Sequence, residues 1–417
     1  MSKNNMHFII PILILTVLAG SCQTGQAPAA CRDALGCVEL APGEPLKLGV
    51  IQALSSGPAV IGQTQLNMLA MAMDERAGML GGHPIETLVE DEFCSAEGGS
   101  AAALKITADP QVVAILGTTC SGAAVRASKV MSAAGLVMVS GLNTAPSLTS
   151  ANGHPGPDWQ RGYFRTSIND IERGRAAAEY AYTQLALATA ATVNDGDAFT
   201  LGLTETFARR FTELGGELVL SAKVNKGDTD MLPVLEAIAF TRPQIVFFSL
   251  FQPEADYLVR QIELAPGLEN TLFLSGGMML ESFIESIGQS GIGLHFIDPT
   301  TPESQAVDEL KSAYTQRFGE APQTNAYLSA FDAANLLLSA IEAVAIAGAD
   351  GSLQIGRQAL RDHLYATTNF PGVQGSLTCD RFGDCGFANL VITRLDDPAA
   401  GLDGLRKNVL YNYMSQP

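Results

Sequence analysis

The sequence predicts an α/β protein with two doubly wound lobes, each a mainly parallel sheet covered by helices on both faces. The first observation is size, because 417 residues with 47% hydrophobic composition can bury more than one core. The second is an alternation of short apolar segments with longer amphipathic segments from Lys47 onward, which is typical of βαβ units. The third is that this alternation forms two blocks, separated by the polar, turn-rich segment 150–161.

In the first block, two neighbouring apolar segments end in turns rich in hydroxyl groups. The segment 112–121 (VVAILGTTCS) leads into a helix, and 136–149 (LVMVSGLNTAPSLT) leads into irregular chain. Ser121 and Thr144 are therefore expected at neighbouring strand ends, where backbone N–H groups are open to a ligand. Such a site can hold a carboxylate without a metal ion or an arginine. The other elements expected here are strands at 47–54 and 85–90 and helices at 65–76 and 99–108.

The second block ends with a predicted return to the first lobe. Its expected helices are 171–188, 200–214, 231–240 and 254–264, and its expected strands are 191–194, 217–223, 244–250 and 271–274. A strand at 293–297 precedes the return, which continues with helices at 303–318, 325–347 and 353–367 and strands at 372–377 and 388–394. We expect lobe 1 to comprise 47–165 and 298–372, and lobe 2 to comprise 166–297 and 373–413. A hinge of several strands suits closure around a ligand.

The charge balance argues against one class of partner. Only 16% of the residues are charged, and the formal net charge is −18. An acidic surface repels nucleic acid and anionic lipid, and no basic stretch is present that could neutralise phosphates. Nucleic-acid binding is therefore not expected.

The N-terminus predicts export and a lipid anchor. A single lysine precedes the apolar run 8–19, which is too short to span a bilayer and suits a signal peptide. The following Gly20-Ser21-Cys22 resembles a bacterial lipobox, so residues 1–21 are expected to be removed and Cys22 to carry lipid. The alternative is an ordinary secretory signal with a chance cysteine. Residues 22–46, rich in Ala, Pro, Gly and Gln, are then expected to form a tether.

The remaining six cysteines predict disulfides, as expected for an exported protein. Two pairs are close in sequence (CRDALGC and CDRFGDC), which leaves one further pair. By elimination the expected disulfides are Cys31 with Cys37, Cys379 with Cys385, and Cys94 with Cys120. A zinc site is the competing interpretation, but neither short pair has ligand spacing and the histidines are scattered singly. No metal or cofactor is expected.

Five segments together resemble one family. They are KLGVIQALSSGPAVIG, VEDEFCSAEGGSAAALKI, VVAILGTTCSGAAVRAS, LVMVSGLNTAPSLT and GVQGSLTCDRFGDCGFANLVI. In order and spacing they resemble the periplasmic Leu/Ile/Val-binding proteins, the solute receptors of branched-chain amino acid ABC transporters. The resemblance covers nearly all of 47–395. It implies the type I periplasmic binding protein fold, with two lobes joined by three crossovers and the ligand between them, and a disulfide at Cys94 and Cys120.

The resemblance also implies a ligand site on the first lobe. The family holds the carboxylate and ammonium of an amino acid with a serine, a threonine and a backbone carbonyl, whose counterparts here are Ser121, Thr144 and Leu142. Independently, a carboxylate at a helix N-terminus gains about 0.3 to 2 kcal/mol from the helix dipole. The alternative is that Ser121 caps its helix and Thr144 a turn, as these residue types commonly do.

The second lobe departs from the family pattern. The family usually closes the site with two aromatic residues and an acid that neutralises the ammonium, and the counterparts here are Phe199, Phe251 and Gly277. An ammonium buried without its counter-charge is penalised by about 3 to 5 kcal/mol. Either another carboxylate neutralises the ammonium, and the candidates are Asp195, Asp197 and Glu281, or the ligand has no ammonium. In the second case Phe199, Phe251 and Met278 line an apolar pocket, although ordinary core packing would also explain them.

These observations favour a lipid-anchored receptor outside the bacterial cell membrane. We expect it to be a monomer that captures a small amino acid, or a related carboxylate or amide, and delivers it to a membrane permease. An exported hydrolase is one alternative, in which Cys120 would be the nucleophile, yet the sequence has no GxSxG, HExxH, GxxxxGK or GxGxxG motif. A sensory ligand-binding protein is the other, although no apolar run after residue 22 reaches 18 residues.

Overall fold

The computed structural model describes residues 1, 30–55, 57–151, 153–277 and 279–414. The predicted signal peptide, apart from Met1, and the predicted lipidation site Cys22 lie outside these residues, as does Met278. Two large sheets organise the described chain. We call the six-stranded sheet with its helices lobe 1 and the seven-stranded sheet with its helices lobe 2.

Lobe 1 has the strand order β3-β4-β2-β5-β6-β9, parallel except for β3. Side chains on its central strands alternate between two cores. Leu48 and Val50 pack with α1 and α10 on one face, whereas Ile51 and Ile115 pack with α2 and α3 on the other. The strands are β2 (Leu46–Gln52), β3 (Met79–Leu80), β4 (His83–Asp91), β5 (Val112–Gly117), β6 (Met138–Ser140) and β9 (Tyr163–Arg165). The helices are α1 (Ala59–Asp74), α2 (Ala96–Thr107), α3 (Ser121–Ala133), α9 (Gln305–Phe318), α10 (Ala326–Val344) and α11 (Arg357–Tyr365).

Lobe 2 has the strand order β11-β10-β12-β13-β14-β19-β20, with the last two strands antiparallel to their neighbours. Helices α4 and α5 cover one face through aromatic packing around Phe207 and Phe247, and α6, α7, α8 and α12 cover the other. The strands are β10 (Thr189–Asn194), β11 (Glu217–Lys223), β12 (Ile245–Phe248), β13 (Leu272–Ser275), β14 (His295–Pro299), β19 (Asn389–Arg394) and β20 (Val409–Met414). The helices are α4 (Asp170–Glu179), α5 (Ala198–Glu213), α6 (Leu232–Thr241), α7 (Glu254–Gln261), α8 (Glu281–Ile287) and α12 (Gly401–Lys407).

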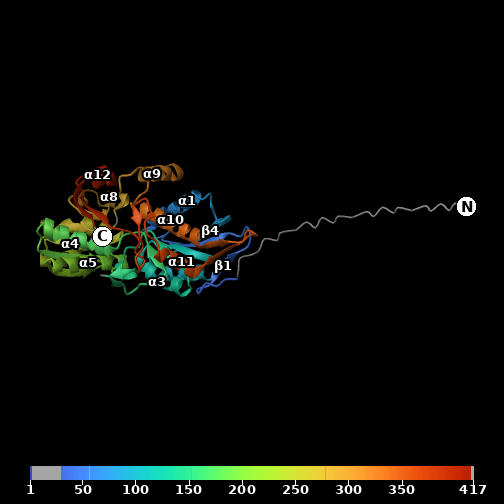
Figure 1. Ribbon diagram of the computed structural model, residues 1–417. Coiled ribbons are helices and arrows are strands. Elements are labelled where there is room, and N and C mark those ends of the chain that lie inside the picture. Colours follow the sequence, from blue (N-terminus) through green and yellow to red (C-terminus); the bar gives the residue numbers. More distant parts are fainter. Residues whose placement is uncertain (2–29, 56, 152, 278, 415–417) are drawn as a thin grey trace.

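Within the described residues the chain passes between the lobes three times. It crosses from β9 to α4, returns from β14 to α9, and crosses again ahead of β19. Figure 1 shows α4 and α5 of lobe 2 at one end of the molecule and α3, α11 and β4 of lobe 1 towards the other. The α/β class with two doubly wound lobes and three crossovers is therefore confirmed.

The predicted tether over 22–46 is wrong for its second half. Strand β1 (Cys37–Leu40) pairs antiparallel with β16 (Leu353–Gly356), and its Val38 and Leu40 are buried in the core of lobe 1. The carboxylate of Asp33 also accepts the backbone N–H groups of Gln358 and Ala359, both at 2.9 Å, at the start of α11. Alternating apolar residues and a capping aspartate thus fold this segment onto lobe 1.

Two predicted helices are also partly wrong. The predicted helix 353–367 begins as β16, because Leu353 and Ile355 alternate into the core, and only Arg357–Tyr365 is helical. The predicted helix 325–347 ends at Val344 and continues as β15 (Ala345–Ala347), which pairs with β16. The remaining short strands pair as hairpins: β7 (Ser150–Ala151) with β8 (His154–Pro155), and β17 (Phe370–Pro371) with β18 (Ser376–Leu377).

Helix α10 is the one described helix that is long and apolar enough to cross a membrane, by length and composition. In this fold 72% of its apolar window is buried. It packs between the sheet of lobe 1 and β16, with Leu337 and Ile341 in the core. The helix therefore serves as a core helix of lobe 1.

Candidate ligand-binding site

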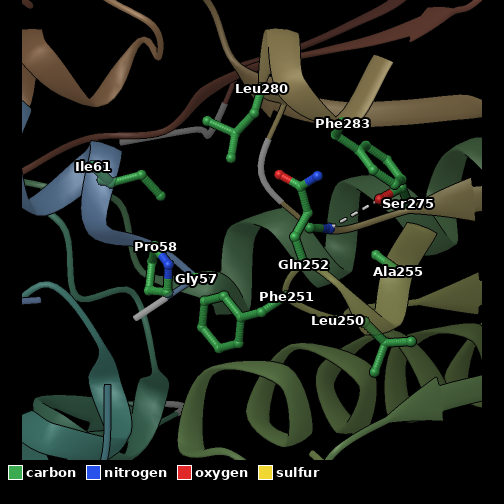
Figure 2. Close-up of a pocket in the computed structure, with 11 residues that line it drawn as sticks. Gly57, Pro58, Ile61, Leu250, Phe251, Gln252, Ala255, Ser275, Leu280 and Phe283 are labelled. Atoms are coloured by element: carbon green, nitrogen blue, oxygen red, sulfur yellow. Dashed lines mark hydrogen bonds between the residues drawn. The ribbon is translucent and has the colours of Figure 1, made fainter. Parts of the chain in front are cut away.

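The two lobes meet at two adjoining cavities that share Pro58, Ile61 and Phe251. We call the cavity beside Ser121 and Phe199 the main cavity and the other the second cavity. The main cavity holds about 370 Å³ of empty space including its mouth, a size within the range of small-molecule sites. Five of the six predicted ligand-binding residues line the main cavity, and the sixth, Gly277, lines the second cavity. The five are Ser121, Leu142, Thr144, Phe199 and Phe251. In the second cavity, Figure 2 shows Pro58 and Ile61 of lobe 1 opposite Gln252 and Phe283 of lobe 2.

Ser121 is the first residue of α3 rather than its cap. The N-cap position is Cys120, whose side chain makes no capping hydrogen bond. The Ser121 hydroxyl oxygen instead accepts the backbone N–H of Ala145 at 3.3 Å, which links the two hydroxyl-rich turns. Because this contact uses only a lone pair, the hydroxyl can still donate its proton to a ligand oxygen, beside the positive end of the α3 dipole.

Thr144 is tied to a buried ion pair that sequence reasoning missed. Its hydroxyl lies 2.6 Å from Oδ2 of Asp170, and Oδ1 of Asp170 lies 3.4 Å from Nε of Arg173. Burial raises the pKa of Asp170, and the positive charge of Arg173 opposes that rise. Arg173 itself lines the main cavity. An arginine therefore lines the cavity in which we expected a carboxylate to be held without one.

A second buried arginine fixes the turn that contains Leu142 and Thr144. Arg165 is fully buried, donates to the carbonyl oxygen of Ala145 at 2.8 Å and pairs with Asp384 at 2.5 Å. Although burial raises the pKa of Asp384, Arg165 lowers it below its usual value. Asp384 lies inside the loop closed by the Cys379–Cys385 disulfide. That loop therefore supports the ligand-binding turn from behind.

Lobe 2 contributes an apolar wall to the main cavity. The rings of Phe199 and Phe251 lie 5.5 Å apart between centroids, inclined at 50°. Ile61 of α1 and Leu142 face the same space from lobe 1. Pro58 and Ile61 were missed by sequence reasoning, because an apolar residue at the start of a helix has the same pattern whether it faces a core or a cavity. The predicted apolar lining by Phe199 and Phe251 agrees with this geometry.

None of the three candidate replacement acids lines either cavity. Asp195 accepts hydrogen bonds from Thr200 and from the backbone of Asp197, Asp197 caps α5, and Glu281 accepts the backbone N–H of Leu402 at 2.8 Å. At Gly277, a Cβ atom would lie 2.9 Å from the carbonyl oxygen of Leu250. An acidic side chain at this position would therefore require the backbone to shift.

Asp197 instead connects the lobes at the start of α3. A methyl group on Gly122 of lobe 1 would lie 2.3 Å from Oδ2 of Asp197. That oxygen also accepts from Nζ of Lys226 at 3.2 Å, and Lys226 in turn reaches the carbonyl oxygen of Cys94 at 3.4 Å. A carboxylate at a helix N-terminus is favourable, so this contact stabilises the approach of the two lobes.

The three predicted disulfides are all present, namely Cys31–Cys37, Cys94–Cys120 and Cys379–Cys385. This pairing removes zinc coordination by these cysteines and a free Cys120 nucleophile from consideration. The Cys94–Cys120 bond joins the loop after β4 to the residue immediately before Ser121. It therefore holds the start of α3 in place beside the main cavity.

Replacing Cys94 and Cys120 together by serine is expected to lower the free energy of unfolding by about 3 kcal/mol, because the bond closes a loop over 26 residues of separation. Urea denaturation measures the loss. We also expect weaker ligand binding, since Ser121 follows Cys120. The control is the replacement of Cys31 and Cys37 by serine. This pair lies away from the cavity, so its replacement should leave ligand affinity unchanged. Equal effects on affinity from both double variants would contradict the positioning role.

Two α/β lobes joined by three crossovers, with a mixed polar and apolar cavity between them, define a solute-binding receptor of the type I class. The chain belongs to the periplasmic binding protein family, which matches residues 45–396. Members of this family bind solutes outside the cytoplasm.

Curated relatives are similar over about half to four fifths of the chain. The Leu/Ile/Val-binding protein BraC3 of Rhizobium johnstonii is 25% identical over 343 residues, which cover 81% of this chain and 88% of that protein. An amino acid binding protein of Pseudomonas aeruginosa is 25% identical over 212 residues, and this match covers 51% of the chain and 54% of that protein.

Solved structures share the fold. A leucine-binding protein from Thermotoga maritima has a TM-score of 0.74 at 22% identity, covering 89% of this chain and 98% of its own. A solute-binding protein of an ABC transporter from Rhodopseudomonas palustris, in complex with p-hydroxybenzoic acid, has a TM-score of 0.74 at 19% identity. The match covers 90% of this chain and 98% of that protein. At these identities the likeness establishes the fold alone.

Proposed function

We propose that this protein is an extracytoplasmic solute-binding lipoprotein of an ABC transporter. It captures a small amino acid, or a related carboxylate or amide, between its two lobes and delivers it to a membrane permease. In this proposal the chain is anchored to the bacterial cell membrane through Cys22 and works as a monomer. Residues 1–21 are its signal peptide.

One observation carries the proposal: the main cavity is lined from both lobes by residues suited to a small carboxylate. Lobe 1 supplies the hydroxyl group of Ser121 at the start of α3 and Thr144 in the neighbouring turn, and lobe 2 supplies Phe199 and Phe251. Polar groups at one end and apolar rings at the other suit a ligand with a carboxylate and a hydrophobic body. The amino acids named for the curated relatives and the p-hydroxybenzoic acid of the structural neighbour both fit this description.

Replacing Ser121 by alanine is expected to weaken binding of any carboxylate solute by about 10- to 100-fold, the worth of one hydrogen bond to a charged group. The ligand is first found by calorimetry on the full chain in mild detergent. The panel contains leucine, 4-methyl-2-oxopentanoate, p-hydroxybenzoate and butyramide.

The matched control for this test is Ser128→Ala. Ser128 is a buried serine on the same helix that lines neither cavity, so its loss should leave affinity unchanged. Equal affinities of wild type and Ser121→Ala would remove Ser121 from the site. Binding of no member of the panel would count against the proposed function.

A further inference from the structure

Arg173 is the one charged side chain among the described residues that line the two cavities. It lies in the first turn of α4, which follows the crossing from lobe 1. Arg173 is only 5% exposed, so its guanidinium group is largely removed from bulk water. Arg173 forms a buried ion pair with Asp170, but only the arginine lines the cavity, so the charged group that a ligand meets there is positive.

The protein satisfies this guanidinium group only in part. Its Nη1 donates to the carbonyl oxygen of Gly276 at 3.3 Å, and its Nε lies 3.4 Å from Oδ1 of Asp170. Among the described residues neither Nε nor Oδ1 of Asp170 has a partner with hydrogen-bond geometry. A planar group with five donors can therefore donate hydrogen bonds to oxygen atoms of a ligand.

The position of Arg173 connects both parts of the predicted site. Through Asp170, which contacts Thr144 at 2.6 Å, it is joined to the hydroxyl end of the cavity. Through Gly276 it reaches the residue next to Gly277, where the resemblance places the acid that would neutralise an ammonium. A positive group thus lies one residue away from the position where a negative one would be required.

The acidic side chains around Arg173 do not place a negative charge in the cavity wall. Asp170 and Asp298 are carboxyl groups that act on it electrostatically, and neither lines a cavity. Asp170 lies behind Thr144 and is fully buried. A ligand ammonium would therefore lie beside a cation without any carboxylate in the cavity wall, which is unfavourable.

We infer that Arg173 binds the carboxylate of the solute together with the hydroxyl group of Ser121, and that the protein selects small organic acids without an ammonium group over amino acids. The inference rests on the proposed receptor function and specifies its substrate class. The hydrophobic body of such an acid lies against Phe199, Phe251 and Ile61. Aromatic carboxylates and 2-oxo acids both belong to this class.

The test uses two ligands that differ only at the α-carbon, leucine and 4-methyl-2-oxopentanoate, together with p-hydroxybenzoate. Calorimetry on the full chain is expected to show at least one of the two ammonium-free acids binding 10-fold or more tightly than leucine. Arg173→Gln should weaken binding of that acid by about 10- to 100-fold, as expected for loss of a charge-assisted hydrogen bond. The same variant should weaken leucine binding less than binding of the acid, because loss of the cation also removes its repulsion of the ammonium group.

Two further variants separate recognition from folding. Arg175→Gln is the matched control, because Arg175 lies on the same helix, pairs with Glu172 at 2.9 Å and has a side chain that is 40% exposed. It should leave all affinities unchanged. The double variant Arg173→Gln with Asp170→Asn removes both charges of the buried pair, so it is expected to stay folded by circular dichroism and still lose affinity for the acid.

The outcomes distinguish a failure of the inference from a failure of the proposed function. Leucine binding as tightly as both acids, or Arg173→Gln binding the acid like wild type, would overturn the inference and leave the receptor function standing. Absence of binding by leucine and by both acids would overturn the inference, and absence of binding by butyramide as well would overturn the proposed function.

Discussion

Replacing Gly122 by alanine is expected to weaken solute binding by about 5- to 150-fold while leaving the unliganded protein as stable as before, or slightly more stable. The added methyl group would lie 2.3 Å from Oδ2 of Asp197, which belongs to the other lobe. Overpacking of this kind costs about 1 to 3 kcal/mol. The cost arises only when the lobes approach each other, because Gly122 and Asp197 share no contact within one lobe.

Asp197 cannot easily move aside to relieve this clash. Its Oδ1 accepts the backbone N–H of Phe199 at 3.0 Å as the cap of α5, and its Oδ2 accepts from Lys226. Loss of such a cap typically costs about 1 kcal/mol. Within α3 alone, alanine is a better helix former than glycine, so thermal unfolding without ligand should not shift downwards.

The control for Gly122→Ala is a second substitution that restores space. Asp197→Ser keeps an oxygen that can cap α5 but removes the carboxylate oxygen that meets the new methyl group. Calorimetry should show the double variant binding more tightly than Gly122→Ala alone. If Gly122→Ala binds as wild type does, the contact between Gly122 and Asp197 is not part of the ligand-bound state.

The sequence predicts the large elements well because their signals are local and repeated. Strands such as β5 are continuous apolar runs, and helices such as α3 follow directly from a turn of small polar residues. The same signals place Ser121 and Thr144 at neighbouring strand ends, and both line the main cavity. Parallel topology makes this inference possible, since adjacent parallel strands end at the same edge of a sheet.

The buried pair Asp170–Arg173 could not be predicted in this way. The helix α4 carries two ion pairs with the same spacing, Asp170 with Arg173 and Glu172 with Arg175. The first is buried and the second is partly exposed, yet both fit the usual pattern of a solvated helix face. Only the crossing between lobes turns the first pair towards the cavity. Segment 30–46 escaped prediction for a similar reason, because its partner strand β16 is more than 300 residues away in sequence.

Glu92→Gln is expected to have a higher free energy of unfolding than wild type. The difference between the two proteins should grow as pH rises from about 5 to about 8, and should reach a few kcal/mol. Glu92 follows β4, is fully buried, and accepts the backbone N–H of Cys120 at 2.7 Å. Burial raises the pKa of its carboxyl group to about 8, and Asp197 and Asp91 add to the rise.

The sign follows from the two protonation states. In the unfolded chain Glu92 loses its proton near its ordinary pKa of 4.5, whereas in the folded protein it keeps the proton to about 8. Unfolding therefore releases a proton at pH values between these two pKa values. The protonated Glu92 side chain stabilises the fold fully below the unfolded-state pKa, and this stabilisation is lost as pH rises through the folded-state pKa. Glutamine cannot ionise, and its amide oxygen can still accept from Cys120. Other titrating groups cancel in the difference between variant and wild type.

Denaturant unfolding of wild type and Glu92→Gln from pH 5 to pH 9 measures this difference, with Glu90→Gln as control. Glu90 lies two residues earlier, in β4, and pairs with Lys105 at the surface, so its loss should show no such trend. A difference between Glu92→Gln and wild type that is constant across this range would mean that Glu92 is ionised in the folded protein. Ligand binding should follow the same titration, because a negative charge behind Cys120 opposes a carboxylate at Ser121. Affinity for an acid should therefore fall above pH 8 in wild type and stay level in Glu92→Gln.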